Sequence, residues 1–284
     1  MTENVFDRIS EAFYSLTAAE KKTADFIMHN PERSQVISIG ELAESSGVAE
    51  ATVSRFCRRL GYKNFNAFGL ALASASATQT PDSGMLSGPV QAGDSIEEMS
   101  QKLYSADQAA MLQTLELIDP DVICRAADML AAAGRVVCMG QGGSMYIAFS
   151  AANLFSTVCG KFSAVEGSHN QVMTAVNLDP GDVILFYSYS GATKDMIDTM
   201  NLAKPRGVKL LLVTRFAKSP GAALADLVLL CGSNESPLQL GSVPAKIAQL
   251  FLTDVLFSEF CRRDMKACLR TRERIAEAMM PKHL

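Results

Sequence analysis

The stretch Asp182-Val-Ile-Leu-Phe-Tyr-Ser-Tyr-Ser-Gly-Ala-Thr-Lys194 decides the fold of the larger part of this chain. Its apolar run has the length of a buried strand, and the Ser, Gly and Thr residues that follow are typical of a tight turn into a helix. A strand that enters a helix through a short turn is the repeating unit of a parallel sheet covered by helices. The stretch therefore predicts an α/β domain.

The residues on either side repeat this alternation of strand and helix. Short β-rich runs occupy residues 135–140, 161–165, 182–188, 209–214 and 227–231. Helix-period segments fill the gaps, at about 120–133, 144–158, 168–176, 193–204 and 244–263. Together they predict a five-stranded parallel sheet with helices on both faces. A further helix, at about 95–117, is expected to pack across this domain or against a second subunit.

A second turn, rich in glycine, follows the first strand, where Gly140 leads into Gln141-Gly-Gly-Ser144. It departs from the GxGxxG fingerprint of dinucleotide sites, because Met145 stands in place of the third glycine. In addition, no acidic residue ends the next strand in the register that binds a ribose, and Glu166 is the only candidate. Both turns would open at the carboxyl edge of the sheet, where helix N-termini and hydroxyl donors suit a phosphate monoester. The expected ligand residues of the two turns are Gly142, Gly143, Ser144, Ser188, Ser190, Gly191 and Thr193. Simple helix capping is the alternative for either turn taken alone.

The first part of the chain has the period of helices and contains a helix-turn-helix pattern. Thr17-Ala-Ala-Glu20 matches a capping box that begins a helix, and Asn30-Pro31 ends that helix. Farther on, Ala43, Gly47 and Val53 supply the small residue, the turn residue and the apolar anchor that a helix-turn-helix needs. The remaining buried positions of this motif are expected to be Leu42, Val48, Phe56 and Leu60, and Ala49 stands where a capping Ser or Thr would begin the second helix.

The outer face of that second helix carries a local positive charge. The whole chain has a formal net charge of −4, with 26 Lys and Arg against 30 Asp and Glu, so no global basic field draws it to nucleic acid. Between Glu50 and Lys63, however, four positive charges oppose one negative charge. Hydroxyl and guanidinium groups can contact the bases and phosphates of duplex DNA. The expected DNA-binding residues are Thr52, Ser54, Arg55, Arg58 and Arg59, which face outward on the helix, and Lys63, which follows just beyond it. An ordinary helical hairpin with a solvated basic face is the alternative.

A stretch rich in Pro, Gly and Ser separates these two parts. Residues 79–94 have the composition of an exposed linker, which predicts a helix-turn-helix domain at 1–78 and an α/β domain at 95–284, with its core at about 120–263. The N-terminus lacks the features of a signal peptide, and no apolar run nears the roughly 20 residues that span a bilayer. The seven cysteines form no CxxC pair and sit mostly in apolar surroundings. We expect a cytoplasmic protein with no membrane partner.

With these residues in view, the chain resembles the RpiR family of bacterial transcriptional regulators. In the first part the resemblance rests on Glu50-Ala-Thr-Val-Ser-Arg-Phe-Cys-Arg-Arg-Leu-Gly-Tyr62 and Phe65-Asn-Ala-Phe-Gly-Leu-Ala-Leu72. The rest is similar to a sugar isomerase (SIS) domain, in the segments Gly140-Gln-Gly-Gly-Ser144, Tyr187-Ser-Tyr-Ser-Gly-Ala-Thr193, Ser219-Pro-Gly-Ala-Ala-Leu-Ala-Asp226 and Lys246-Ile-Ala-Gln-Leu250. The resemblance covers nearly the whole chain, and the segments follow the order of the family.

This resemblance implies a DNA-binding regulator of carbohydrate metabolism whose SIS domain senses a phosphorylated sugar through Ser144, Ser188, Ser190 and Thr193. Its partners would be a double-stranded DNA operator, the sugar phosphate, and a second copy of itself in a homodimer or higher oligomer, because one small helix-turn-helix usually needs a second half-site. No cofactor and no metal are expected. Two departures from the family pattern bear on the identity of the ligand. Gln141 is bulky for the glycine-rich turn, and the stretch Gln239-Leu-Gly-Ser-Val-Pro-Ala-Lys246 lacks the Arg-Ser start and the Ser-Arg end that the family pattern has before Ile-Ala-Gln-Leu250.

An aldose–ketose phosphosugar isomerase on the same scaffold is the alternative, since a fold does not fix a function. Isomerisation requires a base, usually Glu or His. The loop at 237–246 contains no Asp or Glu, and Glu235 lies just upstream. His169 is the remaining candidate base, and it could equally contact a ligand hydroxyl or cap a helix. If the chain is a regulator, no residue is catalytic and His169 is a ligand contact. A pure protein-interaction module would leave the two phosphate-type turns unexplained.

Overall fold

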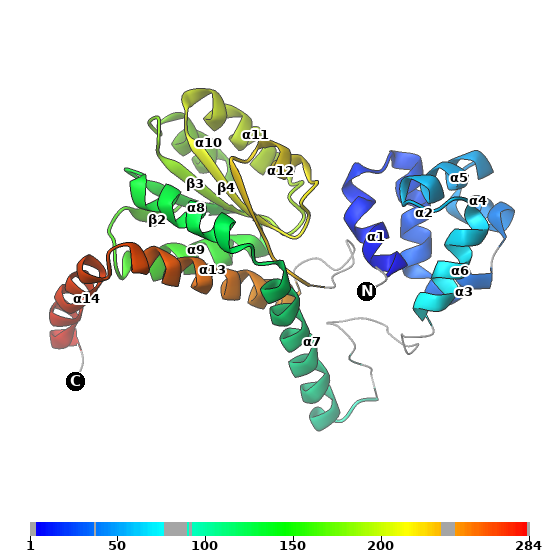
Figure 1. Cartoon of the computed structure of the whole chain (residues 1–284), viewed down its shortest axis with the longest axis horizontal. Coiled ribbons are helices and arrows are strands. Elements are labelled where there is room, and N and C mark those ends of the chain that lie inside the picture. Colours follow the sequence, from blue (N-terminus) through cyan, green and yellow to red (C-terminus); the bar gives the residue numbers. More distant parts are fainter. Residues whose placement is uncertain (1–3, 37, 77–89, 91–92, 234–241, 283–284) are drawn as a thin grey trace. The chain divides into compact units, whose positions relative to one another are not determined.

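The computed structural model describes residues 4–36, 38–76, 90, 93–233 and 242–282. The chain divides into two compact units between Ser100 and Gln101, inside a helix at Ile96–Leu117 most of which belongs to the second unit. The helices and strands of the two units are labelled in Figure 1. Most of the expected linker at 79–94 lies outside the described residues, so this boundary stays a prediction.

The described part of the first unit is helical. Its helices are α1 (Val5–Ala12), α2 (Ala18–His29), α3 (Pro31–Val36), α4 (Ile39–Ser46), α5 (Glu50–Arg59) and α6 (Phe65–Ser76), with a short 3₁₀ turn, η1 (Phe13–Ser15). The capping box predicted for α2 is present, because Thr17 accepts a hydrogen bond from the Glu20 backbone and Glu20 accepts one from the Thr17 backbone. The helix ends before Pro31, as predicted.

The helix-turn-helix is formed by α4 and α5. Gly47 lies between them with φ +64°, a left-handed conformation that costs glycine least. Ala43 and Val53 are buried where the two helices meet. The other positions expected to be apolar also lie in or against the core of this unit, which contains Leu42, Phe56 and Leu60 with Val48 packed beside them. Ala49 makes no side-chain cap, as its residue type predicts.

The second unit is an α/β domain around one parallel sheet. Its strands are β1 (Val136–Gly140), β2 (Phe162–Ala164), β3 (Val183–Tyr187), β4 (Lys209–Thr214) and β5 (Leu227–Leu230). Its helices are α7 (Ile96–Leu117), α8 (Pro120–Ala132), α9 (Gly143–Ser156), α10 (Ser168–Val176), α11 (Lys194–Ala203), α12 (Pro220–Leu224), α13 (Val243–Arg263) and α14 (Met265–Met279), with the 3₁₀ turns η2 (Lys204–Arg206) and η3 (Met280–Lys282). The strand order is β2-β1-β3-β4-β5, and every pair is parallel. The predicted fold class is confirmed.

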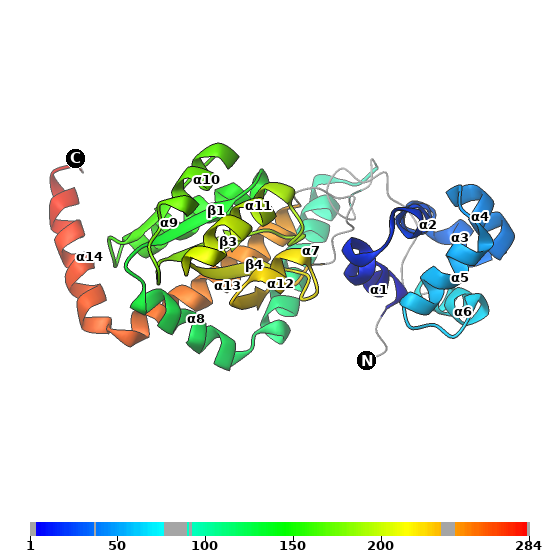
Figure 2. The ribbon, with the colours of Figure 1, turned by 90° about the horizontal axis from the view of Figure 1, so that it is seen from above.

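Helices cover both faces of this sheet, which Figure 2 shows from above. Side chains of β1 alternate between the two faces: Val136 and Cys138 join one core, and Val137 and Met139 join the other. The first core is completed by residues of α8, α9 and α13. The second is completed by residues of α10 and α11. Because the sheet is buried on both faces, its strands are apolar runs without a polar side.

Two helices of this unit were not predicted. α12 is a short helix, with Ser219 accepting a hydrogen bond at its start and Pro220 in its first turn. α14 continues the chain beyond α13 after a break at Asp264, which caps it. None of the helices in the described ranges combines the length and the apolar character that a membrane span requires.

Candidate functional site

The order of the strands identifies one edge of the sheet as the place for a ligand. The chain runs outward from β1 to β2, and then returns to the other side of β1 to form β3, β4 and β5. In open α/β sheets, ligands bind at the carboxyl ends of the strands where the order reverses. Here that point lies between β1 and β3. Both turns that the sequence singles out follow these two strands.

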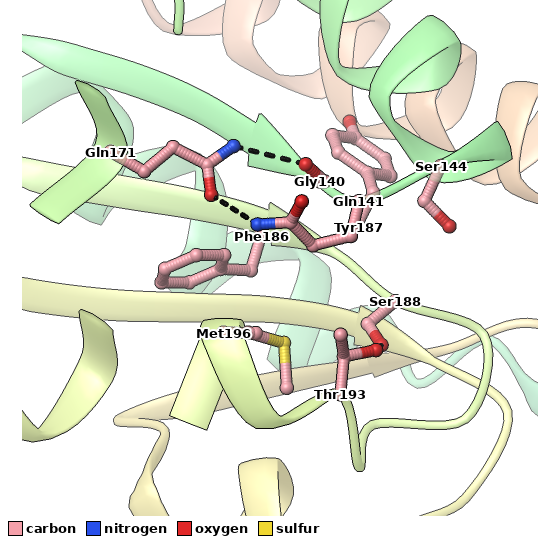
Figure 3. Close-up of a pocket in the computed structure, with 9 residues that line it drawn as sticks. All are labelled: Gly140, Gln141, Ser144, Gln171, Phe186, Tyr187, Ser188, Thr193 and Met196. Atoms are coloured by element: carbon pink, nitrogen blue, oxygen red, sulfur yellow. Dashed lines mark hydrogen bonds between the residues drawn. The ribbon is translucent and has the colours of Figure 1, made fainter. Parts of the chain in front are cut away.

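The turn from β3 into α11 gathers hydroxyl groups. The buried Ser188 accepts a hydrogen bond from the Gly191 N–H at 3.2 Å, and its Oγ lies 3.4 Å from the Oγ1 of Thr193 (Figure 3). The Oγ of Ser190 accepts from the Ala192 N–H at 3.2 Å. The turn therefore places several hydroxyls at the entrance to one helix.

Gly191 allows this turn to form. Its φ of +59° lies in the left-handed region, and a Cβ at this position would overlap with the Oγ of Ser219 and come within 2.9 Å of the Oγ1 of Thr214. No larger residue fits without displacing these groups. The packing of β4 and the start of α12 thus fixes the backbone of the turn.

The helices that begin beside β1 and β3 lack side-chain caps. Within the described ranges, no side chain accepts a hydrogen bond from the first turn of α9 or of α11. The same holds for α10, whereas Ser219 caps α12 and Ser242 caps α13. The first N–H groups of a helix otherwise need acceptors, and an anion satisfies them while it also interacts with the positive end of the helix dipole. In α9 the N–H groups of Ser144 and Met145 already donate to the carbonyls of Gln141 and Gly142, both at 3.1 Å. Among the described residues, the start of α11 therefore offers an anion more unpaired N–H groups than the start of α9 does.

A small cavity of about 20 Å³ lies at this edge. Its lining residues come from the ends of β1 and β3 and from the starts of α9, α10 and α11: Gly140, Gln141, Ser144, Gln171, Phe186, Tyr187, Ser188, Thr193 and Met196. Two of these lining residues are bonded to each other, since the Nε2 of Gln141 donates to the Oε1 of Gln171 at 2.7 Å (Figure 3). The Tyr187 hydroxyl is engaged with Thr253, 3.0 Å away, and burial raises the pKa of this phenol. It is therefore not available as an acid or base.

The structure brings together part of the predicted ligand set. Ser144, Ser188 and Thr193 line the cavity. Gly142, Gly143, Ser190 and Gly191 belong to the two turns without lining it. His169 is exposed in the first turn of α10 and is not a lining residue either.

Two polar residues near the cavity were missed as site residues. Gln171 is 0% exposed, although the residues before it on the helix are ordinary polar residues. The sequence indicates its burial only weakly, through its position one helical turn before the buried Ala175. Lys246, in the first turn of α13, lies over the glycine-rich turn: a Cβ on Gly143 would be 3.3 Å from its Cε and 3.8 Å from its Nζ. A positive charge thus lies beside the start of α9.

On the helix-turn-helix, five of the six predicted DNA-binding residues lie at the surface. Arg55, Arg58, Arg59 and Lys63 are exposed, and Ser54 is half-buried. The expected outward orientation of Thr52 is wrong, because this residue is only 7% exposed. It lies one helical turn before the buried Phe56 and so shares its inward face, and its hydroxyl accepts a hydrogen bond from Arg55 at 3.3 Å. Thr52 therefore positions an arginine and is not itself at the surface.

No cluster of metal ligands is present in the parts of the chain that the structure describes, since no three His, Cys, Asp or Glu side chains there come close enough to share an ion.

Comparison with known proteins identifies both units. The helix-turn-helix domain of the rpiR family matches residues 3–79, and the SIS domain matches residues 129–259. The chain is 31% identical, over 271 residues and 95% of both chains, to an uncharacterised HTH-type transcriptional regulator of Caldanaerobacter subterraneus. It is 30% identical to the HTH-type transcriptional regulator HexR of Pseudomonas aeruginosa, over 98% of this chain and 96% of HexR.

A solved structure is similar over the same length. The Vibrio vulnificus NanR protein, determined in complex with ManNAc-6P, is 26% identical, with a TM-score of 0.64 and coverage of 99% of both chains. The two family domains occur in this order, and the relatives match nearly the whole chain, so both comparisons assign the same family. The chain is an HTH-type transcriptional regulator of the RpiR family, with a helix-turn-helix domain followed by a SIS domain.

Proposed function

We propose that this regulator binds a phosphorylated sugar at the carboxyl edge of its SIS sheet, and that the bound sugar changes its affinity for a DNA operator. The observation that carries the proposal is the pair of uncapped helix N-termini, α9 and α11, on the two strands where the strand order reverses. That the similar NanR protein was determined with ManNAc-6P supports the same class of ligand.

The phosphate group fits the turn between β3 and α11. There the hydroxyls of Ser188 and Thr193 lie 3.4 Å apart beside the first N–H groups of α11. Hydroxyl and backbone donors at the positive end of a helix dipole are a common phosphate site. Lys246 adds a positive charge on the other side, at the start of α9. The sugar ring then extends toward the turn between β1 and α9, where Ser144 and Gln141 lie.

Sensing rather than catalysis fits the residues of this site. An isomerase needs a general base within reach of the sugar carbons. Among the described residues that line the cavity, none is Asp, Glu or His. His169 is exposed outside the lining, and Glu235 lies outside the described residues. The isomerase alternative therefore rests on groups that the described site does not contain.

DNA binding is assigned to the outer face of α5 and the residue that follows it closely, Lys63. The exposed arginines there can pair with guanine bases or hold phosphates. A homodimer or higher oligomer would pair two such helices with two half-sites of an operator. A ligand can change DNA binding only if it binds two conformational states of the protein with different affinities. We propose that these states differ in the arrangement of the two SIS domains of a dimer, and that the sugar phosphate favours one arrangement. For a regulator of this bacterial family, we propose a location in the cytoplasm.

Calorimetry on the purified full chain tests the ligand half of this proposal. Hexose, pentose and amino-sugar phosphates are titrated beside the corresponding unphosphorylated sugars. We expect one sugar phosphate to bind with a clear saturation curve and its unphosphorylated counterpart to bind far more weakly. If every phosphorylated and unphosphorylated sugar behaves alike, the site is not a sugar-phosphate sensor. Conversion of one of them into its isomer during the titration would favour the enzyme.

A further inference from the structure

A chain of amide hydrogen bonds fixes the side chain of Gln141 at the cavity. The fully buried Gln171 donates from its Nε2 to two backbone carbonyls, that of Gly140 at 3.0 Å and that of Val165 at 2.9 Å. Its Oε1 accepts from Gln141 at 2.7 Å. Gln171 thus ties the end of β1 to the end of β2 and holds Gln141 as its last partner.

This arrangement determines which atom of the Gln141 amide is which. A backbone carbonyl only accepts, so the group of Gln171 that faces two carbonyls must be its NH₂. The other group of Gln171 is then its oxygen, and the group of Gln141 that contacts it must be a donor. It follows that the amide oxygen of Gln141 is the atom left outside the chain of hydrogen bonds. In the described part of the protein, this oxygen has no hydrogen-bond partner.

The other polar groups of the lining are engaged elsewhere or lie at the phosphate end. Gln171 and Tyr187 are bonded within the protein, and Phe186 and Met196 are apolar. The hydroxyls of Ser188 and Thr193 belong to the turn into α11. Toward β1, the lining offers Ser144 and the amide of Gln141. A cavity of about 20 Å³ holds little more than one water molecule, so a sugar ring that binds here must contact the side chains at its border.

We propose that Gln141 is a specificity-determining residue for the sugar end of the ligand, with its Oε1 accepting a hydrogen bond from a ligand hydroxyl or N–H. This inference rests on the proposed function. An acceptor held in one orientation favours a sugar phosphate with a donor at the facing carbon over the analogue that lacks it, because the deoxy ligand leaves the oxygen without a partner. The phosphate end of the ligand is not involved.

The test separates these two ends of the ligand. Calorimetry measures the affinity of the full chain and of Gln141→Leu for the tightest-binding sugar phosphate of the panel, for its monodeoxy analogues and for inorganic phosphate. Gln108→Leu, an exposed glutamine of α7, is the matched control for exchange of an amide by an apolar side chain. In Gln141→Leu we expect about tenfold weaker binding of the sugar phosphate and unchanged binding of inorganic phosphate. We also expect the unaltered protein to bind one deoxy analogue about tenfold more weakly than the parent sugar phosphate. In Gln141→Leu, that analogue and the parent sugar phosphate should bind with equal affinity.

Each remaining result counts against the proposal. Unchanged affinity for the sugar phosphate in Gln141→Leu would show that the amide makes no contact with it. Equal losses for the sugar phosphate and for inorganic phosphate would make Gln141 a structural support of the whole edge. If the unaltered protein binds inorganic phosphate but discriminates no sugar phosphate from it, the proposed function itself is wrong, and this inference is wrong with it.

Discussion

The carboxylate of Glu20 links the start of α2 to the end of α5. Its Oε2 accepts hydrogen bonds from the backbone and the hydroxyl of Thr17, both at 2.9 Å, and from the Nη1 of Arg59, also at 2.9 Å. One buried group therefore caps α2 and pairs with α5. Arg59, whose side chain is 43% exposed, has its charge partly satisfied inside the domain. We therefore expect Arg59 to contribute less to DNA binding than Arg55 or Arg58.

Replacing Glu20 by Gln should destabilise the helix-turn-helix domain. The change removes the charged partner of Arg59 and weakens the cap of α2, which together should cost roughly 1–2 kcal/mol of unfolding free energy. Urea denaturation followed by circular dichroism measures this cost. Glu44→Gln, at an exposed position of α4, is the control and should change little. Equal stabilities of the two variants would contradict the role given to Glu20.

The same carboxylate should make the domain sensitive to acid. Burial raises the pKa of Glu20, but hydrogen bonds from Thr17 and the positive charge of Arg59 outweigh this effect and hold the pKa below its ordinary value of 4.5. A group whose pKa is lowered by folding stabilises the native state above its unfolded pKa, and this contribution is lost as the pH falls through the folded pKa. Stability measured from pH 6 downward should therefore decline below about 4.5, with a smaller decline in Glu20→Gln. Parallel curves for the two proteins would exclude this explanation.

Arg55→Ala should weaken binding to an operator and leave ligand binding intact. We expect about a tenfold loss of DNA affinity, since a base contact contributes roughly 1–3 kcal/mol, and no change in affinity for a sugar phosphate. Arg270→Ala, at an exposed position of α14, removes the same charge from the other unit as a control. Fluorescence anisotropy on labelled duplex measures the first quantity and calorimetry the second. Equal losses of both would contradict the division of labour between the two units.

Thr193→Val should impair the phosphate site without loss of volume. The hydroxyl that lies 3.4 Å from Ser188 is removed, and we expect about tenfold weaker binding of a sugar phosphate with DNA affinity preserved in its absence. Ser190→Ala should have the same direction, through the support that Ser190 gives the Ala192 N–H. Thr271→Val in α14 serves as the control. If Thr193→Val bound the sugar phosphate with wild-type affinity, the turn between β3 and α11 would not be the phosphate site.

Gly191→Ala should destabilise the SIS domain. The left-handed φ and the overlap of a Cβ with Ser219 together should lower the unfolding free energy by about 3 kcal/mol. At Gly160 a Cβ meets no atom within 4 Å and the φ is not left-handed, so Gly160→Ala is the matched control. Thermal unfolding compares them. A midpoint for Gly191→Ala as high as that of the control would show that the turn is less constrained than its contacts indicate.

Sequence reasoning identified the sheet, the helix-turn-helix and the two turns because each depends on local patterns. The apolar run before Ser188 and the glycine at position 47 determine their own backbone. Thr52 and Gln171 show the limit of such reasoning. Whether Thr52 faces solvent depends on how α5 packs against the rest of its domain, and the role of Gln171 depends on two carbonyls that are distant in sequence. Contacts of this kind are set by the tertiary fold.

The central claim is that a sugar phosphate bound at the SIS sheet controls binding of DNA by α5. Fluorescence anisotropy of the full chain on duplex from upstream of its own gene, at two salt concentrations and with each sugar phosphate of the panel, tests it most directly. The account predicts that one sugar phosphate shifts the DNA dissociation constant at both salt concentrations, and that Thr193→Val loses this shift while it still binds the duplex. Specific DNA binding that no sugar phosphate alters, or an undiminished shift in Thr193→Val, would contradict it.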